Sequence, residues 1–188
     1  MVRRPSDLAS AGRLFLGVPI TPEARHVVRE ALNPDRMPGR PVPPENWHLT
    51  LVFLGDTAGD AKARLSESLR LERLGPSFAV ELGGLGAFPR ASRASILWLG
   101  VSEGGGAMAA LNQAVGRAVR RMGFRVEERR FTPHITLSRM RPPGDVRPFM
   151  SRAPGLRYRM EVDGVSLFRS HLGDGPARYE ELERFELG

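Results

Sequence analysis

The sequence contains one four-residue pattern twice, at His48-Leu49-Thr50-Leu51 and again at His134-Ile135-Thr136-Leu137. In a strand, successive side chains point to opposite faces, so each copy places its histidine and threonine on one face and its aliphatic residues on the other. Within each copy the imidazole and the hydroxyl then lie about 7 Å apart along the strand. Two copies in a chain with four histidines are unexpected by chance, and they favour one paired site.

Two imidazoles and two hydroxyls on facing strands suit acid–base chemistry on a phosphodiester. Imidazole titrates near neutrality, so a neutral ring can take a proton from the attacking oxygen while a protonated ring gives one to the leaving oxygen. In-line displacement at phosphorus sets these two oxygens on opposite sides, where two facing strands can serve them. Thr50 and Thr136 can donate hydrogen bonds to the non-bridging oxygens. A cyclic phosphate opened by water fits these groups, and no metal ion or other cofactor is required.

Other catalytic classes find less support in the sequence. A zinc site usually gathers three or four ligands, and the carboxylates nearest the motifs, Asp56 and Asp145, are expected to lie outside the motif strands. A Ser-His-Asp hydrolase is also poorly supported by the sequence. The chain has no cysteine, which excludes disulfides and thiolate chemistry.

The elements that must position the two motifs repeat in the same order. Residues 13–18 read as a strand and 21–32 as a helix, and a proline-rich loop leads to His48. In the second half, residues 96–101 read as a strand and 106–122 as a helix before His134. This repeat predicts two pseudo-symmetric lobes, each of which contributes one motif strand to a central cleft.

The remaining segments indicate an α+β fold class. Further strands are expected at residues 77–82, 156–167 and 178–187, with a helix at 60–74. The glycines at 83, 84 and 86 predict a bulge or turn within a strand, and those at 104–106 predict a hairpin tip. With 188 residues, the chain is expected to form one domain with a single core.

The charge of the chain indicates an anionic partner. It carries 28 basic and 21 acidic side chains, with a net charge of +7, and its only lysine is Lys62. Guanidinium groups bind phosphate bidentately, so RNA or DNA is the expected partner. Eight of the arginines lie between Arg117 and Arg141, around the second motif, and part of them are expected on a solvated helix face and the rest along the rim of the cleft. The apolar run near the N-terminus is too short for a signal peptide or a membrane span, so we expect a cytoplasmic protein that binds no membrane.

The two motifs with their neighbours, residues 47–55 and 133–139, resemble those of the two-histidine (2H) phosphoesterase superfamily. Within it, they resemble most the bacterial and archaeal RNA 2′,3′-cyclic phosphodiesterases, historically called 2′-5′ RNA ligases. Weaker similarities extend over nearly the whole chain, at residues 13–16, 86–89 and 97–100, Ser170 and Tyr179. The resemblance implies a single bilobal domain over residues 1–188, with two pseudo-symmetric, mainly antiparallel sheets flanked by helices around a central cleft.

The resemblance also implies a reaction and a role for each site residue. RNA ends with a 2′,3′-cyclic phosphate, such as those of tRNA fragments, would be hydrolysed to 2′-phosphomonoesters, with His48 as proton donor and His134 as proton acceptor. Thr50, Thr136 and Arg139 would bind the substrate, and the protein is expected to act as a monomer. A true 2′-5′ RNA ligase and a non-catalytic RNA-binding protein are the alternatives.

Several side chains outside the histidines and threonines of the two motifs also enter this interpretation. By strict alternation Arg139 would point away from His134, so a bulge or the strand end must redirect it. His26 is expected on the surface of a helix, and His171 on the surface or at the rim of the cleft. Aromatic residues that could stack on a base are Trp47, Phe53, Phe88 and Tyr179. Of these, Phe53 is expected in the core, because its parity matches that of Leu49.

Overall fold

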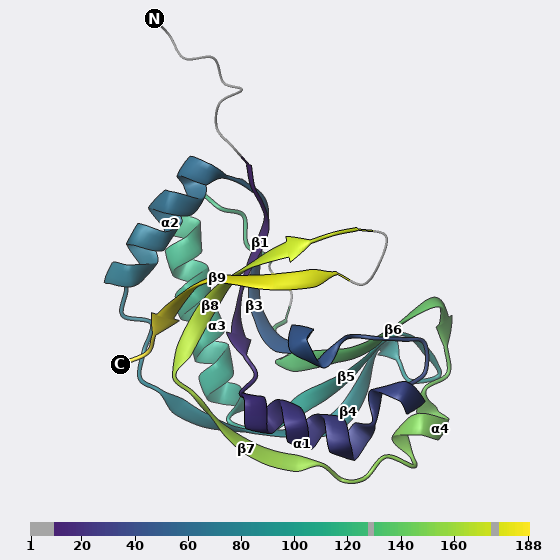
Figure 1. The fold of residues 1–188 in the computed structure, drawn as a ribbon. Helices are drawn as coiled ribbons and strands as arrows, with labels where there is room; N and C mark the ends of the chain where they lie inside the picture. The colour runs from purple at the N-terminus through teal and green to yellow at the C-terminus, as the bar shows by residue number, and fades with distance from the viewer. Residues whose placement is uncertain (1–9, 128–129, 174–176) are drawn as a thin grey trace, which may run out of the picture.

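The computed structural model describes residues 10–127, 130–173 and 177–188 (Figure 1). The described elements, in chain order, are β1 (Ser10–Pro19), α1 (Pro22–Leu32), β2 (Arg40–Pro41), β3 (His48–Ala58), α2 (Gly59–Leu71), β4 (Phe78–Arg90), β5 (Arg93–Glu103), α3 (Gly105–Arg121), β6 (His134–Gly144), α4 (Arg147–Met150), β7 (Arg157–Val162), β8 (Gly164–His171) and β9 (Arg178–Glu186). Short 3₁₀ turns occur at Pro34–Arg36 and Pro44–Asn46. The predicted α+β class is confirmed.

The strands form one antiparallel sheet in the order β7-β4-β5-β6-β3-β1-β8-β9, with β2 added to β6. The motif strands β3 and β6 are neighbours at the centre of the sheet. Each has three further strands outside it: β1, β8 and β9 beyond β3, and β5, β4 and β7 beyond β6. The expectation of two separate sheets requires a correction, because one backbone pair, Leu49 with Ile135, joins them. We call β3, β1, β8 and β9 the His48 lobe, and β6, β5, β4 and β7 the His134 lobe.

Each lobe is built from both halves of the chain. Strand β4 follows β3 and α2 in the sequence but pairs with β5 in the His134 lobe. Strand β8 comes near the end of the chain and pairs with β1. The helices cross in the same way, because α1 follows β1 but contacts β7, and α3 follows β5 but packs on β3 beside α2 (Figure 1). The two motif strands are therefore held by segments that each half supplies to the other.

Apolar spacing explains which helix faces are buried. Helix α1 begins after Thr21, whose hydroxyl accepts a hydrogen bond from the Ala24 amide at 3.2 Å. Its buried residues, Ala24, Val28 and Leu32, recur every four positions and form one stripe. Helix α3 buries a similar stripe that includes Met108, Leu111 and Val115. No helix in the described part of the chain is long and apolar enough to cross a membrane.

Three local predictions met different outcomes. The glycines at 83, 84 and 86 lie in an irregular part of β4, as expected for a bulge. The strand predicted over residues 156–167 is instead two strands, β7 and β8, which are separated at Asp163. The predicted hairpin tip at residues 104–106 is wrong, because Gly104 has φ of 82° and caps the start of α3. A left-handed residue before a helix favours glycine, so the glycines do mark a change of chain direction, but it leads from β5 into α3 and not into a hairpin.

Candidate active site

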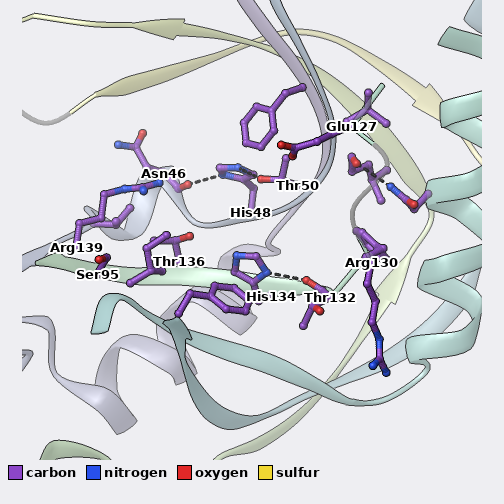
Figure 2. Close-up of a pocket in the computed structure, with 18 of the residues that line it drawn as sticks. Asn46, His48, Thr50, Ser95, Glu127, Arg130, Thr132, His134, Thr136 and Arg139 are labelled. Atoms are coloured by element: carbon purple, nitrogen blue, oxygen red, sulfur yellow. Dashed lines mark hydrogen bonds between the residues drawn. The ribbon is translucent and has the colours of Figure 1, made fainter. Parts of the chain in front are cut away.

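A cavity of about 760 Å³ lies between the two lobes and is lined by all five residues that the sequence analysis selected. His48 and Thr50 reach it from β3, and His134, Thr136 and Arg139 reach it from β6. Figure 2 shows the two imidazoles facing one another across this space, with Thr50 and Thr136 beside them. The described structure thus brings both motifs to one site.

The single backbone pair between β3 and β6 arranges the four motif side chains. Because the strands are antiparallel, its register sets His48 opposite Thr136 and Thr50 opposite His134. All four side chains share one face of the sheet, with the two histidines on one diagonal and the two threonines on the other. An anion of phosphate size can therefore touch both imidazoles.

Arg139 faces the cavity because β6 contains the predicted bulge. The adjacent residues Leu97 and Trp98 of β5 pair with residues of β6 that are two positions apart, so Leu137 is an extra residue in β6. Leu137 and its neighbour Ser138 are consequently both buried, and alternation resumes one position later. The bulge brings Arg139 to the same side as His134 and removes the conflict with strict alternation.

A bulge occurs at the equivalent place in β3, where the sequence analysis did not expect one. The adjacent residues Leu16 and Gly17 of β1 pair with residues of β3 that are two positions apart, and Leu51 is the extra residue. Leu51 and Val52 are both buried, whereas the next residue, Phe53, is 63% exposed and lines the cavity. The prediction that Phe53 packs in the core is therefore wrong, because it assumed unbroken alternation.

His48 is oriented through both of its ring nitrogens. Its Nδ1 lies 2.7 Å from the carbonyl oxygen of Asn46, and because a carbonyl can only accept, Nδ1 carries a hydrogen. Its Nε2 lies 2.8 Å from Thr50 Oγ1 and, in the neutral ring, accepts the hydrogen bond of that hydroxyl. The ring also packs against Phe15, at 4.7 Å between centroids, and against the edge of Tyr179, at 5.2 Å.

His134 is held in the same manner from the other lobe. Its Nδ1 lies 2.7 Å from the carbonyl oxygen of Thr132, which again assigns the hydrogen to Nδ1 and directs Nε2 away from the backbone (Figure 2). Its ring contacts Phe88 edge to face at 5.1 Å and Trp98 at 5.8 Å. Each imidazole is therefore fixed by the carbonyl two residues before it and by aromatic neighbours.

Burial makes both rings difficult to protonate in the free protein. It lowers the pKa of His48 from 6.5 to about 4, and the charges of His134 and Arg139 act in the same direction. Burial also lowers the pKa of His134, with a further contribution from Arg139. Both imidazoles are therefore neutral near pH 7, and an anion bound between them would raise the pKa of each.

A buried asparagine, which the sequence analysis missed, connects the His48 site to β9. The Asn46 side chain accepts a hydrogen bond from the Tyr179 amide at 3.1 Å and donates one to the Ala177 carbonyl at 2.5 Å. These bonds hold Tyr179 against His48, while the Asn46 carbonyl orients the ring. A lone asparagine before Trp-His carries no distinctive signal, since its role depends on a strand more than 130 residues away.

The other residues under consideration are placed as follows. Phe88 and Tyr179 line the cavity, but Trp47 is buried in the core and donates its indole hydrogen bond to the Val42 carbonyl at 3.0 Å. His26 is exposed on α1, as expected. His171 is not among the residues that line the cavity, and it pairs with Glu180 at 2.7 Å.

Together these groups can perform acid–base catalysis around an anion. Each Nε2 atom can accept or donate a proton, two hydroxyls and one guanidinium can donate to negatively charged oxygens, and aromatic rings border the space. The charge-bearing oxygens of a phosphodiester match these donors. A nucleobase would match the aromatic rings.

Comparisons with known proteins show which family the chain resembles. A model of the 2′-5′ RNA ligase superfamily matches residues 21–174. The RNA 2′,3′-cyclic phosphodiesterase of Archaeoglobus fulgidus is 32% identical over 183 residues, which cover 93% of this chain and 99% of that protein. The protein of the same name from Aeropyrum pernix is 38% identical over 117 residues, which cover 61% of this chain and 64% of that protein. The crystal structure of Escherichia coli LigT complexed with 3′-AMP matches with a TM-score of 0.76 at 29% identity, covering 94% of this chain and 98% of LigT.

Proposed function

This chain belongs to the 2′-5′ RNA ligase superfamily, and on that premise we propose that it hydrolyses RNA ends bearing a 2′,3′-cyclic phosphate to 2′-phosphomonoesters. The observation that carries the proposal is the pairing of the two motifs in one cavity. His48 and His134 each hold Nδ1 on a backbone carbonyl, which leaves both Nε2 atoms for chemistry, and Arg139 lies with them. Relatives named RNA 2′,3′-cyclic phosphodiesterase in archaea and bacteria support the choice of substrate.

In the proposed reaction, a water molecule attacks the phosphorus and gives its proton to Nε2 of His134. The bond between phosphorus and the 3′ oxygen breaks, and that oxygen takes a proton from Nε2 of His48. The products are a 2′-phosphomonoester and a 3′ hydroxyl, and solvent then restores the protonation of the two rings. Neutral His134 is suited to act as the base.

The role of His48 as acid requires a proton that the free protein does not hold near pH 7. Its pKa of about 4 reflects burial first, together with the positive charge of Arg139 and, when His134 is protonated, that of His134. A bound cyclic phosphate carries a negative charge that opposes these effects, so we propose that His48 becomes protonated as the substrate binds. The Thr50 hydroxyl, which donates to His48 in the free protein, then turns to a phosphate oxygen. Thr136 and Arg139 would donate to the other charged oxygens.

We propose that the reaction proceeds without a metal ion. Within residues 10–127, 130–173 and 177–188, no group of three or more histidine, aspartate or glutamate side chains is arranged to hold one. Protonation of the leaving oxygen by His48 would provide the charge compensation that a metal ion otherwise supplies. Further proposals are that the protein acts as a monomer in the cytoplasm and that its substrates include tRNA fragments. Light scattering on the purified protein would test the monomer.

A second candidate activity is the joining of RNA ends through a 2′-5′ linkage, which the description of the superfamily favours. It uses the same pair of histidines in the same roles, with the 5′ hydroxyl of a second RNA in place of water: that hydroxyl gives its proton to His134, the bond from phosphorus to the 3′ oxygen breaks, and His48 protonates that oxygen. An oligonucleotide that ends in a 2′,3′-cyclic phosphate, incubated with the protein in EDTA, tests both activities. We expect a 2′-phosphomonoester, and adding an RNA with a free 5′ hydroxyl would reveal any ligation. A 3′-phosphomonoester would contradict the proposed bond cleavage, loss of turnover in EDTA would indicate a required metal, and binding without turnover would indicate a non-catalytic protein.

A further inference from the structure

A second cavity, of about 390 Å³, lies beside the first along α3. Four residues line both cavities, so the two share a wall: Asn112, Val126, Glu127 and Phe131. Asn112 also fixes the position of this wall, since its side chain donates a hydrogen bond of 2.7 Å to the carbonyl of Leu51, the bulged residue of β3. The second cavity is therefore next to the part of the first that Phe53 borders.

The surface of α3 that lines the second cavity is polar and positively charged. Arg117 and Arg120 are both exposed and three positions apart, so they emerge on the same side of the helix, with Gln113 one turn earlier. Gly116 lies among them and contributes no side chain, which leaves room above the helix backbone. Glu127, on the shared wall, is the acidic residue among those that line this cavity.

We propose that the second cavity binds the RNA backbone on the 5′ side of the terminal nucleotide. This inference rests on the proposed function and specifies its substrate as an RNA chain and not a mononucleotide. If the cyclic phosphate lies between the two histidines beside Arg139, the ribose and base extend away from Arg139 and past Phe53. The next phosphate in the 5′ direction then meets Arg117 and Arg120.

The chemistry of this path is that of single-stranded RNA binding. Such sites combine a positively charged groove, which follows the phosphates, with aromatic side chains on which bases stack. Here Phe53 borders the first cavity and Phe131 stands on the shared wall, before the two arginines. A guanidinium can bind a phosphate through two parallel hydrogen bonds, which glutamine in its place cannot reproduce.

The test compares two substrates and two variants. The substrates are a 2′,3′-cyclic mononucleotide and a short RNA with the same terminal nucleotide and a 2′,3′-cyclic phosphate. The test variant is Arg117→Gln/Arg120→Gln. The control is Arg121→Gln, which removes one positive charge from the same helix, but from a side chain that pairs with Glu72 at 2.5 Å and does not line the cavity.

We expect the double variant to lower kcat/KM for the RNA about tenfold at low salt, as for the loss of two partly exposed phosphate contacts, and to leave the mononucleotide unchanged. The slope of log kcat/KM against log salt concentration should also decrease by about 0.7 for each lost contact with single-stranded RNA. The control should alter neither substrate. An equal loss on both substrates, or no loss on either, would overturn the inference.

A binding measurement separates this inference from the proposed activity. Fluorescence anisotropy with a 5′-labelled RNA that ends in a 3′-phosphate requires no turnover. We expect the double variant to bind this RNA about tenfold more weakly than the native protein and the Arg121→Gln control do. Unchanged affinity would refute the RNA path even if hydrolysis occurs. A native protein that binds RNA through these arginines but opens no cyclic phosphate would refute the proposed function alone.

Discussion

The two motif strands follow the same course for five residues and then present different chemistry to the same cavity. Both carry a histidine and a threonine on one face, and both bulge at the aliphatic residue that follows the threonine. Five positions after the histidine, the bulge turns the side chain into the cavity: Arg139 in β6 and Phe53 in β3. The same kind of β-bulge thus turns a charged side chain into the cavity from β6 and an aromatic side chain into it from β3. In the proposed function, the Arg139 side of the cavity would bind phosphate and the Phe53 side a base.

The two bulges are also supported in different ways. The carbonyl of Leu137 accepts a hydrogen bond of 2.8 Å from the backbone amide of Val42, in the segment that leads from β2 to β3. The carbonyl of Leu51 accepts from the side chain of Asn112 on α3. A backbone donor is present whatever the residue type, whereas a side-chain donor depends on the residue. The Phe53 side of the cavity is therefore the side that substitution of one residue can disturb.

The largest expected effect tests what the two strands share. His48→Ala and His134→Ala should each lower kcat/KM by about 10²–10⁴-fold, the usual contribution of a positioned proton donor or acceptor. The double variant should be little worse than either single variant, because the two rings act in one step. His26→Ala, on an exposed helix position, is the matched control. Steady-state kinetics on a cyclic-phosphate RNA measures all four, and near-native turnover in either single variant would sink the two-histidine mechanism.

A substrate with a sulfur in place of the 3′ oxygen separates the roles of the two histidines. A thiolate leaves without needing a proton, so an acid becomes dispensable while a base does not. We expect this substrate to restore most of the activity of His48→Ala, by at least tenfold, and to leave His134→Ala impaired. Rescue of His134→Ala instead would reverse the roles, and that outcome is of interest because His48 is the more difficult ring to protonate in the free protein.

The next effect concerns the position at which the strands differ. Arg139→Gln should lower kcat/KM by about 10²–10³-fold, comparable to the removal of one donor to a developing charge. It should also raise the pKa of both histidines, because its positive charge lowers them. The acidic limb of the pH–rate profile, where the base must be neutral, then moves to higher pH.

Phe53→Leu should lower kcat/KM about tenfold through lost stacking, and it should leave the acidic limb of the pH–rate profile in place. Equal pH profiles for the two variants would contradict the division into two sides.

The burial of His48 should make the folded protein less stable at acid pH. Its pKa is about 4 in the folded protein and 6.5 unperturbed, so between these values the unfolded chain binds a proton that the folded chain does not. The free energy of unfolding should therefore fall as pH decreases from 6.5 to 4, by about 3 kcal/mol from this residue. His48→Gln should remove that part of the decline, and denaturant titrations at pH 7 and pH 4 measure it. A native protein equally stable at both values would show that His48 is solvated.

The smallest expected effects come from the threonines. Thr50→Ala and Thr136→Ala should each lower kcat/KM about tenfold, the value of one hydrogen bond to a charged group. Thr50→Ala should also disturb His48, whose Nε2 accepts from this hydroxyl, whereas no such bond of Thr136 occurs among the described residues. Thr50→Ser and Thr136→Ser keep the donor and should recover most of the activity. A change in the pH profile only in the Thr50 variant would sharpen the distinction between the strands.

Side-chain chemistry with period-two spacing was enough to predict the paired site. His48, Thr50, His134 and Thr136 could be assigned to one cavity because the same pattern occurs twice and alternation fixes its faces. Arg139 required an additional bulge, which the conflict between its parity and its expected role indicated. For Phe53 no such conflict was visible, since a phenylalanine in the core is an ordinary outcome, and the bulge in β3 remained undetected.

What could not be predicted depends on contacts between distant segments. Asn46 and Asn112 act through backbone groups of β9 and β3, and neither residue belongs to a repeated pattern. The break at Asp163 is an exception, because the dipeptide Asp163-Gly164 is a local turn signal that the sequence analysis left unused. The lobes that β4 and β8 join could not be predicted from local sequence either, because strand pairing depends on which strand edges remain open in the folded sheet.

The place of β8 in the sheet has a consequence for how the protein is made. Strand β1 requires β8 as its neighbour, and the two are separated by about 150 residues of chain. At a synthesis rate of roughly 5–20 residues per second, one edge of β1 waits for about 8 to 30 seconds on the ribosome before its partner exists. An open strand edge invites pairing with another chain. This edge of β1 therefore stays open until β8 has been made, and truncation before β8 should yield insoluble product while leaving both His-x-Thr motifs intact.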